Sequence, residues 1–239
     1  MQWQVACDFD GTIAVEDVTD SVLARFADPA WQEIEAEWKA GRIGSRECMA
    51  RQVDLVRCHP VELDRHLDRI EIDPAFPSFV SYCRRQSIPL RVVSDGLDYV
   101  IRRILGRYGL GDLPIMANRL ERLADGRYRL GFPHALDNCS AASGTCKCAA
   151  LKRPTSELRH TVLIGDGASD FCGATTADLV FAKDRLLAHC ERRRLPYVPF
   201  ADFAEVRRLL AALLRTPART AVPAASELVE QPSAFGAGE

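Results

Sequence analysis

Three short apolar runs, all rich in β-branched residues, limit what this chain can fold into more than any other feature. Together with a fourth run that would form the next strand outward, they span residues 4–9, 89–94, 161–165 and 179–182. Continuous apolar runs of this length are typical of strands covered on both faces, as in a parallel sheet. Stretches of helical periodicity, such as 76–86 and 99–108, lie between them. The alternation predicts an α/β fold in which helices cover both faces of a parallel sheet.

The segment from residue 15 to residue 77 interrupts this alternation. Its apolar residues recur at helical spacing, as Val18 and Val22 do, with Glu and Arg among the intervening residues. The pattern predicts a small helical unit inserted after the first strand. The sheet domain would then consist of residues 1–14 and 78–215.

Two further segments carry local signals. Asp125-Gly126 lies between two apolar stretches, and this dipeptide is typical of the tight turn of a β-hairpin. From residue 216 onward the chain is rich in Ala, Pro, Ser and Gly, which predicts a disordered tail over residues 216–239.

The charge balance argues against several classes of partner. Lys and Arg total 31 against 33 for Asp and Glu, a net charge of −2, which favours neither nucleic acid nor an anionic membrane surface. No apolar run approaches the roughly 18 residues of a membrane span. The start of the chain lacks the pattern of a signal peptide. We therefore expect a soluble, cytoplasmic protein that is a monomer or a homodimer.

The segment Asp8-Phe9-Asp10-Gly11-Thr12 follows the first predicted strand. Two carboxylates at this spacing can face one crevice, where one can attack phosphorus while the other moves protons. Because the two charges repel each other, the site needs a cation. Gly11 permits a tight backbone turn, and Thr12 offers a hydroxyl and amide groups to phosphate oxygens. A turn with a helix cap is the alternative interpretation of this segment taken alone.

Three further segments place useful groups beyond the predicted strands. The second strand ends at Ser94, whose hydroxyl can hold a phosphate oxygen. Lys147 offers a fixed positive charge later in the chain. Asp166 and Asp170 lie on a Gly-rich turn after the third strand, and their carboxylates suit Mg²⁺. Four such segments in this order are improbable as a coincidence.

Together the four segments resemble the signature motifs of haloacid-dehalogenase-superfamily phosphatases, over about residues 4–210. The resemblance implies a Rossmann-like parallel sheet and, in residues 15–77, the small helical cap of the phosphoserine-phosphatase-like branch. Residues 133–148, 181–184 and 199–203 are more closely similar to the phosphatases of methionine salvage.

This resemblance implies a role for each polar residue. Asp8 would be the nucleophile that forms an aspartyl-phosphate, and Asp10 would protonate the leaving alcohol and then accept a proton from water. The phosphoryl group would be bound by Thr12, Ser94, Asp95, Gly96 and Lys147. Mg²⁺ would be held by Asp8, the backbone carbonyl of Asp10, Asp166 and Asp170.

The substrate pocket departs from the phosphoserine phosphatases. Those enzymes carry a Glu about where this chain has Asp17, and a carboxylate-binding Arg where it has Gln52. Glutamine cannot supply that charge, so Arg46 or Arg51 would have to replace it. We therefore expect a small phosphorylated metabolite other than phosphoserine, such as the ester of methionine salvage.

The nine cysteines are scattered and odd in number, so we expect mostly reduced thiols and no disulfide scaffold. Four residues near Lys147 need separate treatment, namely His134, Cys139, Cys146 and Cys148. They could form a thiolate-rich zinc site, a redox pair, or a set of reduced thiols that pack a loop. Their spacing is not a tandem Cys-x-x-Cys pattern, which favours structural thiols without excluding the others.

Three alternatives to the expected phosphatase use the same motifs. A phosphoserine phosphatase would need another positive charge in the cap. A phosphotransferase would pass the aspartyl-phosphate to a second alcohol instead of water. A non-catalytic phosphate-binding regulator is disfavoured, because every expected catalytic group is present.

Overall fold

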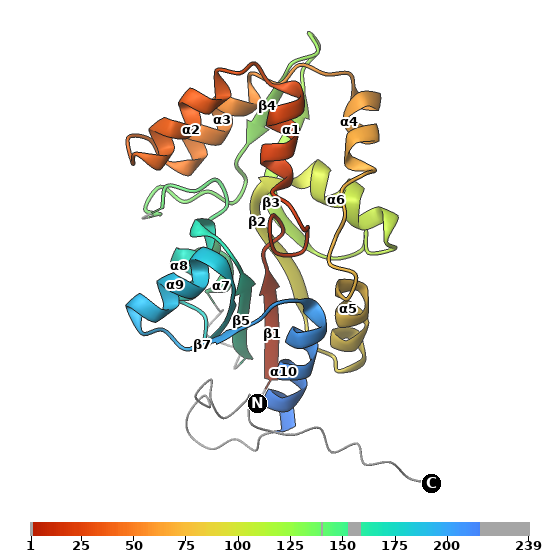
Figure 1. The fold of residues 1–239 in the computed structure, drawn as a ribbon, viewed down its shortest axis with the longest axis vertical. Helices are drawn as coiled ribbons and strands as arrows, with labels where there is room; N and C mark the ends of the chain where they lie inside the picture. The colour runs from red at the N-terminus through yellow and green to blue at the C-terminus, as the bar shows by residue number, and fades with distance from the viewer. Residues whose placement is uncertain (1, 140, 153–158, 216–239) are drawn as a thin grey trace.

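A seven-stranded sheet forms the centre of the described part of the chain (Figure 1). The computed structural model describes every residue except 1, 140, 153–158 and 216–239, so the predicted tail lies outside the described residues. The strands are β1 (Gln2–Cys7), β2 (Leu90–Leu97), β3 (Ile115–Arg122), β4 (Tyr128–Gly131), β5 (Arg159–Gly165), β6 (Leu179–Ala182) and β7 (Tyr197–Pro199). They lie in the order β4-β3-β2-β1-β5-β6-β7, and each pair is parallel except β3 with β4.

Helices connect these strands. They are α1 (Val18–Phe26), α2 (Trp31–Lys39), α3 (Ser45–Val53), α4 (Pro60–Leu67), α5 (Phe76–Arg85), α6 (Asp98–Arg107), α7 (Lys147–Leu151), α8 (Phe171–Ala174), α9 (Asp184–Arg193) and α10 (Phe203–Arg215), with a 3₁₀ turn at Ala168–Asp170. The predicted α/β fold with a mostly parallel sheet is confirmed. The longest described helix has 13 residues, and none in the described ranges has both the length and the apolar character of a membrane span.

Successive side chains along each strand point to opposite faces of the sheet, so the interior has two hydrophobic cores. Val5 and Cys7 of β1 face one side of the sheet, and Ala6 faces the other. Helices α5 and α10 cover the first side, while α7, α8 and α9 cover the second (Figure 1). Both faces of the central strands are therefore buried, which is the physical reason for their continuous apolar runs.

The four predicted strands are confirmed with small shifts of their ends, because β1 stops before Asp8 and β2 continues to Leu97. The predicted hairpin turn is confirmed as well. Gly126 has a φ of +86°, and the amide of Leu123 donates to the carbonyl of Arg127 at 2.8 Å. The turn joins β3 to β4, the antiparallel pair at the edge of the sheet.

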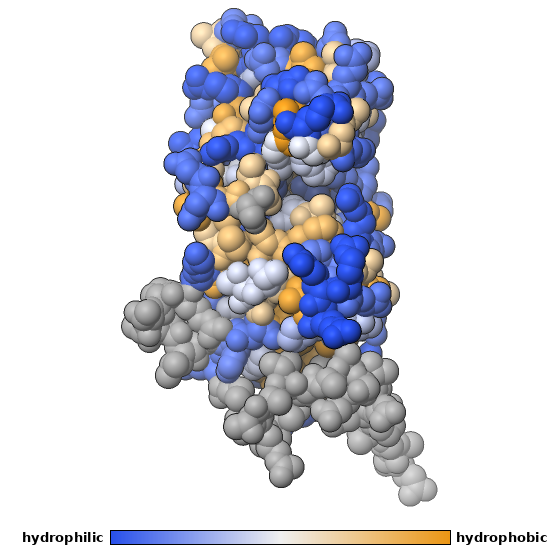
Figure 2. Space-filling model, turned by 90° about the vertical axis from the view of Figure 1, so that its left-hand side faces the viewer, coloured by the Kyte–Doolittle hydropathy of each residue, from blue (hydrophilic) through white to orange (hydrophobic). Residues whose placement is uncertain are grey.

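Helices α1 to α4 fall within the predicted insertion and lie beyond the carboxyl end of β1 (Figure 1). The β3–β4 hairpin extends toward them, and the hydroxyl of Tyr128 donates to the carbonyl of Cys58 at 3.4 Å. The two ends of the segment return side by side, because Ala14 and Ile72 form an antiparallel bridge. Figure 2 shows the side of the molecule that carries α8 and α9, where a hydrophobic middle lies between hydrophilic surfaces.

The aromatic cluster between α5 and α10 provides a test of the core. The ring of Phe203 lies 4.8 Å from that of Phe76 and 5.3 Å from that of Phe79, and its side chain is fully buried. Phe203→Ala should therefore lower the free energy of unfolding by about 3–5 kcal/mol. Urea unfolding followed by circular dichroism measures the change. Phe203→Leu fills most of the space and should cost much less, and equal losses for the two variants would contradict this packing.

Candidate active site

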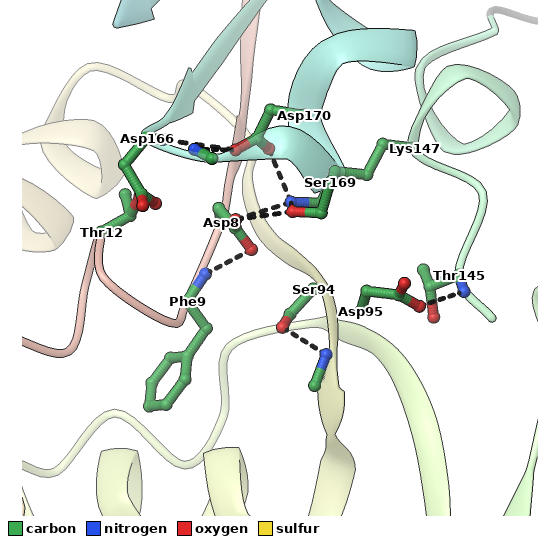
Figure 3. A network of polar contacts seen from close by, with 12 residues as sticks. Asp8, Phe9, Thr12, Ser94, Asp95, Thr145, Lys147, Asp166, Ser169 and Asp170 are labelled. Carbon is green, nitrogen blue, oxygen red and sulfur yellow. Dashed lines mark hydrogen bonds and ion pairs between the residues drawn. The ribbon is translucent and has the colours of Figure 1, made fainter. Parts of the chain in front are cut away.

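Asp8 is the first residue after β1, at the carboxyl end of the central strand of the sheet. Its amide continues the sheet by donating to the carbonyl of Ile164 at 2.9 Å, so the backbone here is fixed. The buried carboxylate accepts the amide of Phe9 at 2.8 Å and the hydroxyl of Ser169 at 3.3 Å, and it lies 2.7 Å from the ammonium of Lys147 (Figure 3).

Lys147 is fully buried at the start of α7. Its ammonium contacts Asp170 at 2.6 Å, Asp8 at 2.7 Å and the hydroxyl of Ser169 at 3.0 Å. Burial alone would lower the pKa of Lys147, but the charges of Asp170 and Asp8 outweigh it and raise the pKa. The three contacts use all three N–H donors of the side chain. The lysine therefore supplies a fixed positive charge at the base of the crevice.

Asp8, Asp166 and Asp170 form a carboxylate group whose ligand oxygens lie within 4.8 Å of one another. One ammonium cannot balance three carboxylates. Burial raises the pKa of Asp166, and repulsion from the charge of Asp8 raises it further. The donors are hard oxygens, which fit Mg²⁺. The residues present thus suit the predicted Mg²⁺. Binding of the ion by the backbone carbonyl of Asp10 stays a prediction.

Two glycines allow the loops to come this close. A Cβ on Gly165 would overlap the carboxylate of Asp170, and one on Gly11 would lie 2.8 Å from an oxygen of Asp166. Gly11 also has a φ of +66°, in the left-handed region that favours glycine. The sequence predicted this role for Gly11 but not the close approach at Gly165.

Asp10 faces the same crevice from the loop that leads into α1. Its carboxylate accepts the amide of Val18 at 2.9 Å. Burial, followed by the charges of Asp17 and Asp8, raises the pKa of Asp10 well above its usual value. A Cβ on Gly96 would overlap Asp10 and lie 3.0 Å from the hydroxyl of Ser94, so the end of β2 lies against this acid.

The predicted phosphate-binding hydroxyls are both buried. Thr12 donates to Asp166 at 2.5 Å, so in this structure its hydroxyl orients a carboxylate. Ser94 accepts the amide of Gly96 at 2.9 Å and keeps its own proton for donation to a ligand. The structure thus places Ser94 beside Asp10 and Thr12 beside Asp166.

Asp95 is predicted to bind phosphate, but the structure directs its side chain away from Asp8 (Figure 3). Successive side chains of a strand point to opposite faces, so Ser94 and Asp95 diverge. The Asp95 carboxylate accepts the amide of Thr145 at 2.8 Å, the side-chain amide of Asn118 at 3.1 Å and the hydroxyl of Ser45 at 2.6 Å. Ser45 begins α3, so this buried carboxylate ties the helical insertion to the sheet.

Asp17 is a predicted cap residue near enough to the carboxylates of the site for Asp8 and Asp166 to affect its pKa. It is the N-cap of α1, where its side chain accepts the amide of Asp20. Asp17 is solvent-exposed, and partial desolvation by the surrounding protein, followed by the charge of Asp20, raises its pKa to about 6; Asp8 and Asp166 add to the effect. Asp17 therefore contributes negative charge at the mouth of the site.

The other three predicted cap residues have partners within the insertion or at its edge. Arg51 is bidentate to Glu37, at 2.8 and 3.2 Å. Gln52 is buried and donates to Glu35 at 2.9 Å. Arg46 is partly exposed, and among the described residues its guanidinium pairs with Asp137 at 3.9 Å. Of the two arginines, Arg46 has the more distant ion-pair partner.

Several residues of the site were missed from the sequence. Ser169 bridges Lys147 and Asp8. Its place between Asp166 and Asp170 in one short turn was the available signal. Thr145 and Asn118, which bind Asp95, carry no sequence signal, because their contacts join segments far apart in the chain.

The comparisons agree with this geometry. The family described as haloacid dehalogenase-like hydrolase matches residues 5–175. The chain therefore belongs to this family, and it is an enzyme of the class that hydrolyses phosphoric monoesters.

Two curated relatives share the same name. The 2-hydroxy-3-keto-5-methylthiopentenyl-1-phosphate phosphatase of Brevibacillus brevis is 32% identical over 207 residues, which cover 85% of this chain and 93% of the relative. The protein of the same name from Geobacillus kaustophilus is 31% identical over 205 residues, covering 84% and 91%.

Solved structures share the fold. A phosphoserine phosphatase solved as an analogue of its phospho-aspartyl intermediate aligns with a TM-score of 0.64 at 22% identity, over 86% of this chain and 97% of that one. A probable phosphoserine phosphatase from Vibrio cholerae gives 0.66 at 18% identity, over 90% and 66%. At these identities the likeness concerns the fold.

The position of Asp95 leads to a prediction that separates a structural from a phosphate-binding role. Asp95→Ala leaves buried donors of Thr145 and Asn118 without partners and should lower the free energy of unfolding by about 1–3 kcal/mol. Asp95→Asn should cost less, because its carbonyl can keep those donors while its NH₂ donates to Ser45. Chemical denaturation of both variants gives the values. Unchanged stability in Asp95→Ala, together with weaker substrate binding in Asp95→Asn, would restore the original assignment.

Proposed function

We propose that the protein is a Mg²⁺-dependent phosphatase in which Asp8 accepts the phosphoryl group and water then releases it. The observation that carries the proposal is the surrounding of Asp8. One carboxylate at the end of a central strand contacts a buried ammonium, lies among two further carboxylates and has a second acid two residues away. This is the set of groups that nucleophilic phosphoryl transfer requires.

In the proposed reaction Asp8 attacks phosphorus and the substrate alcohol leaves. Asp10 gives its proton to the departing oxygen and later takes one from the attacking water. The raised pKa of Asp10 supports the first of these roles, because an acid must hold its proton near neutral pH to donate it. Hydrolysis of the aspartyl-phosphate then restores Asp8.

Lys147 and Ser94 would bind the transferring group. Of the three contacts made by Lys147, the one to Ser169 is the only one to a neutral partner, so a phosphate oxygen would replace it at the least cost. The free proton of the Ser94 hydroxyl would reach a second oxygen. Together they would stabilise the charge of the phosphoryl group in transfer.

Asp8, Asp166 and Asp170 are the residues that would hold Mg²⁺, whose charge, when bound, offsets that of the carboxylates and of the phosphoryl oxygens. Thr12 would keep Asp166 oriented, and Lys147 would keep Asp170 oriented. Such outer contacts fix the ligand geometry.

We propose the enolic ester 2-hydroxy-3-keto-5-methylthiopentenyl-1-phosphate as the substrate, with helices α1 to α4 acting as a cap that reads the leaving group. The names of the curated relatives support it. So does the cap, where Gln52 is engaged with Glu35 and Arg51 with Glu37. Neither side chain offers a free positive charge to the carboxylate of phosphoserine.

Asp17 provides a test of the acid role of Asp10. The Asp10 pKa is raised, so activity that needs its proton is present at low pH and is lost as pH rises through that pKa. Asp17→Asn removes the largest charge that raises it and retains an N-cap residue for α1. The basic limb of the pH profile of kcat/KM should therefore move to lower pH for an alkyl phosphate.

Glu16→Gln is the matched control for this experiment. It removes the same charge one residue away, and Glu16 is not among the main causes of the raised pKa of Asp10. The leaving group of an aryl phosphate departs with little help from an acid. The fall of kcat/KM at high pH should therefore be small for aryl phosphates in every variant. A limb that stays in place in Asp17→Asn would argue that another group is the acid.

Substrate choice gives a second test. The wild type should prefer the salvage ester to phosphoserine in kcat/KM. Gln52→Arg alone should change little, because Glu35 lies 2.9 Å from the Gln52 amide and would neutralise the new charge. Gln52→Arg combined with Glu35→Gln should raise phosphoserine turnover roughly ten- to a hundredfold, the value of a charge-assisted pair.

Glu35→Gln alone is the control, and it should leave phosphoserine turnover low. A wild-type enzyme that prefers phosphoserine would show that another cap residue, with Arg46 the first candidate, supplies the charge. The substrate assignment would then be wrong, although the phosphatase chemistry would stand.

A further inference from the structure

A cluster of four thiols lies beside the catalytic lysine, on the side of the sheet covered by α7 and α8. The Sγ atoms of Cys146, Cys148 and Cys172 are all within 4.8 Å of one another. Cys146 and Cys148 lie 3.2 Å apart and flank Lys147 in the chain. The thiol of Cys139 lies near that of Cys146 and contacts the hydroxyl of Ser143 at 3.3 Å.

The cluster differs from the group that the sequence indicated. His134 contributes its backbone carbonyl, which accepts the amide of Cys146 at 3.2 Å. Cys172, at the start of α8, belongs to the group of converging thiols, whereas His134, which the sequence suggested, does not. All four cysteines are free.

We propose that Cys139, Cys146, Cys148 and Cys172 bind one structural zinc ion. A tetrahedral zinc with bonds of about 2.3 Å places its sulfur ligands roughly 3.8 Å apart. The Sγ atoms of Cys146 and Cys148 are 3.2 Å apart, and those of Cys146, Cys148 and Cys172 all lie within 4.8 Å of one another, so small side-chain movements bring these three into place. Cys139 would supply the fourth ligand from the preceding loop. Four protein ligands leave no open position, which is typical of a structural site and not of a catalytic one. Binding needs no oxidant, since each thiol releases a proton to solvent as its sulfur bonds to the metal.

The backbone around the cluster is arranged for such a site. A Cβ on Gly173 would lie 3.2 Å from the Cβ of Lys147, so glycine next to Cys172 lets α8 approach the start of α7. Cys139, Cys148 and Cys172 are only half-buried, which leaves a path for the ion. Metal here would join the loop after β4 to α7 and α8.

The alternatives explain less. A disulfide between Cys146 and Cys148 would use two of the four sulfurs and leave Cys139 and Cys172 without a reason to be there. Packing of reduced thiols would not need three sulfur atoms within 4.8 Å of one another, two of them on half-buried residues. A metal accounts for the number, the spacing and the convergence of two separate segments.

The site can be tested with cobalt as a spectroscopic substitute for zinc. The reduced, full-length protein without magnesium should bind about one Co²⁺ at this site and show the sulfur-to-cobalt charge-transfer band and intense visible bands of a tetrahedral thiolate site. Zn²⁺ should displace it and raise the Tm. Cys172→Ser and, separately, Cys139→Ser should weaken binding by more than the roughly ten- to hundredfold that outer contacts contribute.

Two control variants make the result specific. Cys58→Ser removes a half-buried thiol outside the cluster and should leave the spectrum unchanged. Asp166→Asn removes a carboxylate of the proposed magnesium site and should also retain the thiolate bands. The proposal is overturned by a wild-type protein without a thiolate band, or by Cys172→Ser and Cys139→Ser spectra equal to the wild type. No readout uses a substrate, so the outcome is independent of the proposed phosphatase reaction.

Discussion

The buried ammonium of Lys147 is the interaction on which the rest of the site depends. A charged side chain without solvent contact is tolerated only when every donor has a partner and the charge is balanced. Asp8, Asp170 and Ser169 satisfy these conditions, and they come from the ends of two adjacent parallel strands. The lysine thus draws the carboxyl ends of β1 and β5 into one site. The same contacts leave an excess of negative charge, for which a divalent cation is the natural counterpart.

The helical insertion is held over this site by a second buried charge. The carboxylate of Asp95 accepts hydrogen bonds from Ser45 of α3 and from Thr145, which lies two residues before Lys147. The helical insertion and the segment that carries Lys147 are therefore fixed to the same carboxylate. The proposed zinc ion would fix Lys147 from its other side, through Cys146 and Cys148. The lysine would then be positioned from two sides, by the hydrogen bonds of Asp95 and by the proposed metal ion.

Much of the fold could be predicted because its central strands are buried on both faces, so their apolar runs are continuous. Strand β7 and the start of β3 could not, since a three-residue strand and a run of mixed polarity carry little pattern. The residues that carry the proposed chemistry follow strand ends and have local motifs. What escaped prediction was tertiary, namely the turning of Asp95 away from Asp8 and the arrival of Cys172 beside Cys148.

The central claim is that Asp8 carries the phosphoryl group during turnover. Acid quenching in the steady state, followed by peptide mass spectrometry, tests it most directly, because an acyl phosphate survives acid and is cleaved by hydroxylamine. The account predicts a phosphate on the peptide that contains Asp8 and none in Asp8→Asn. A phosphorylated residue elsewhere, or rapid turnover by Asp8→Asn, would contradict it.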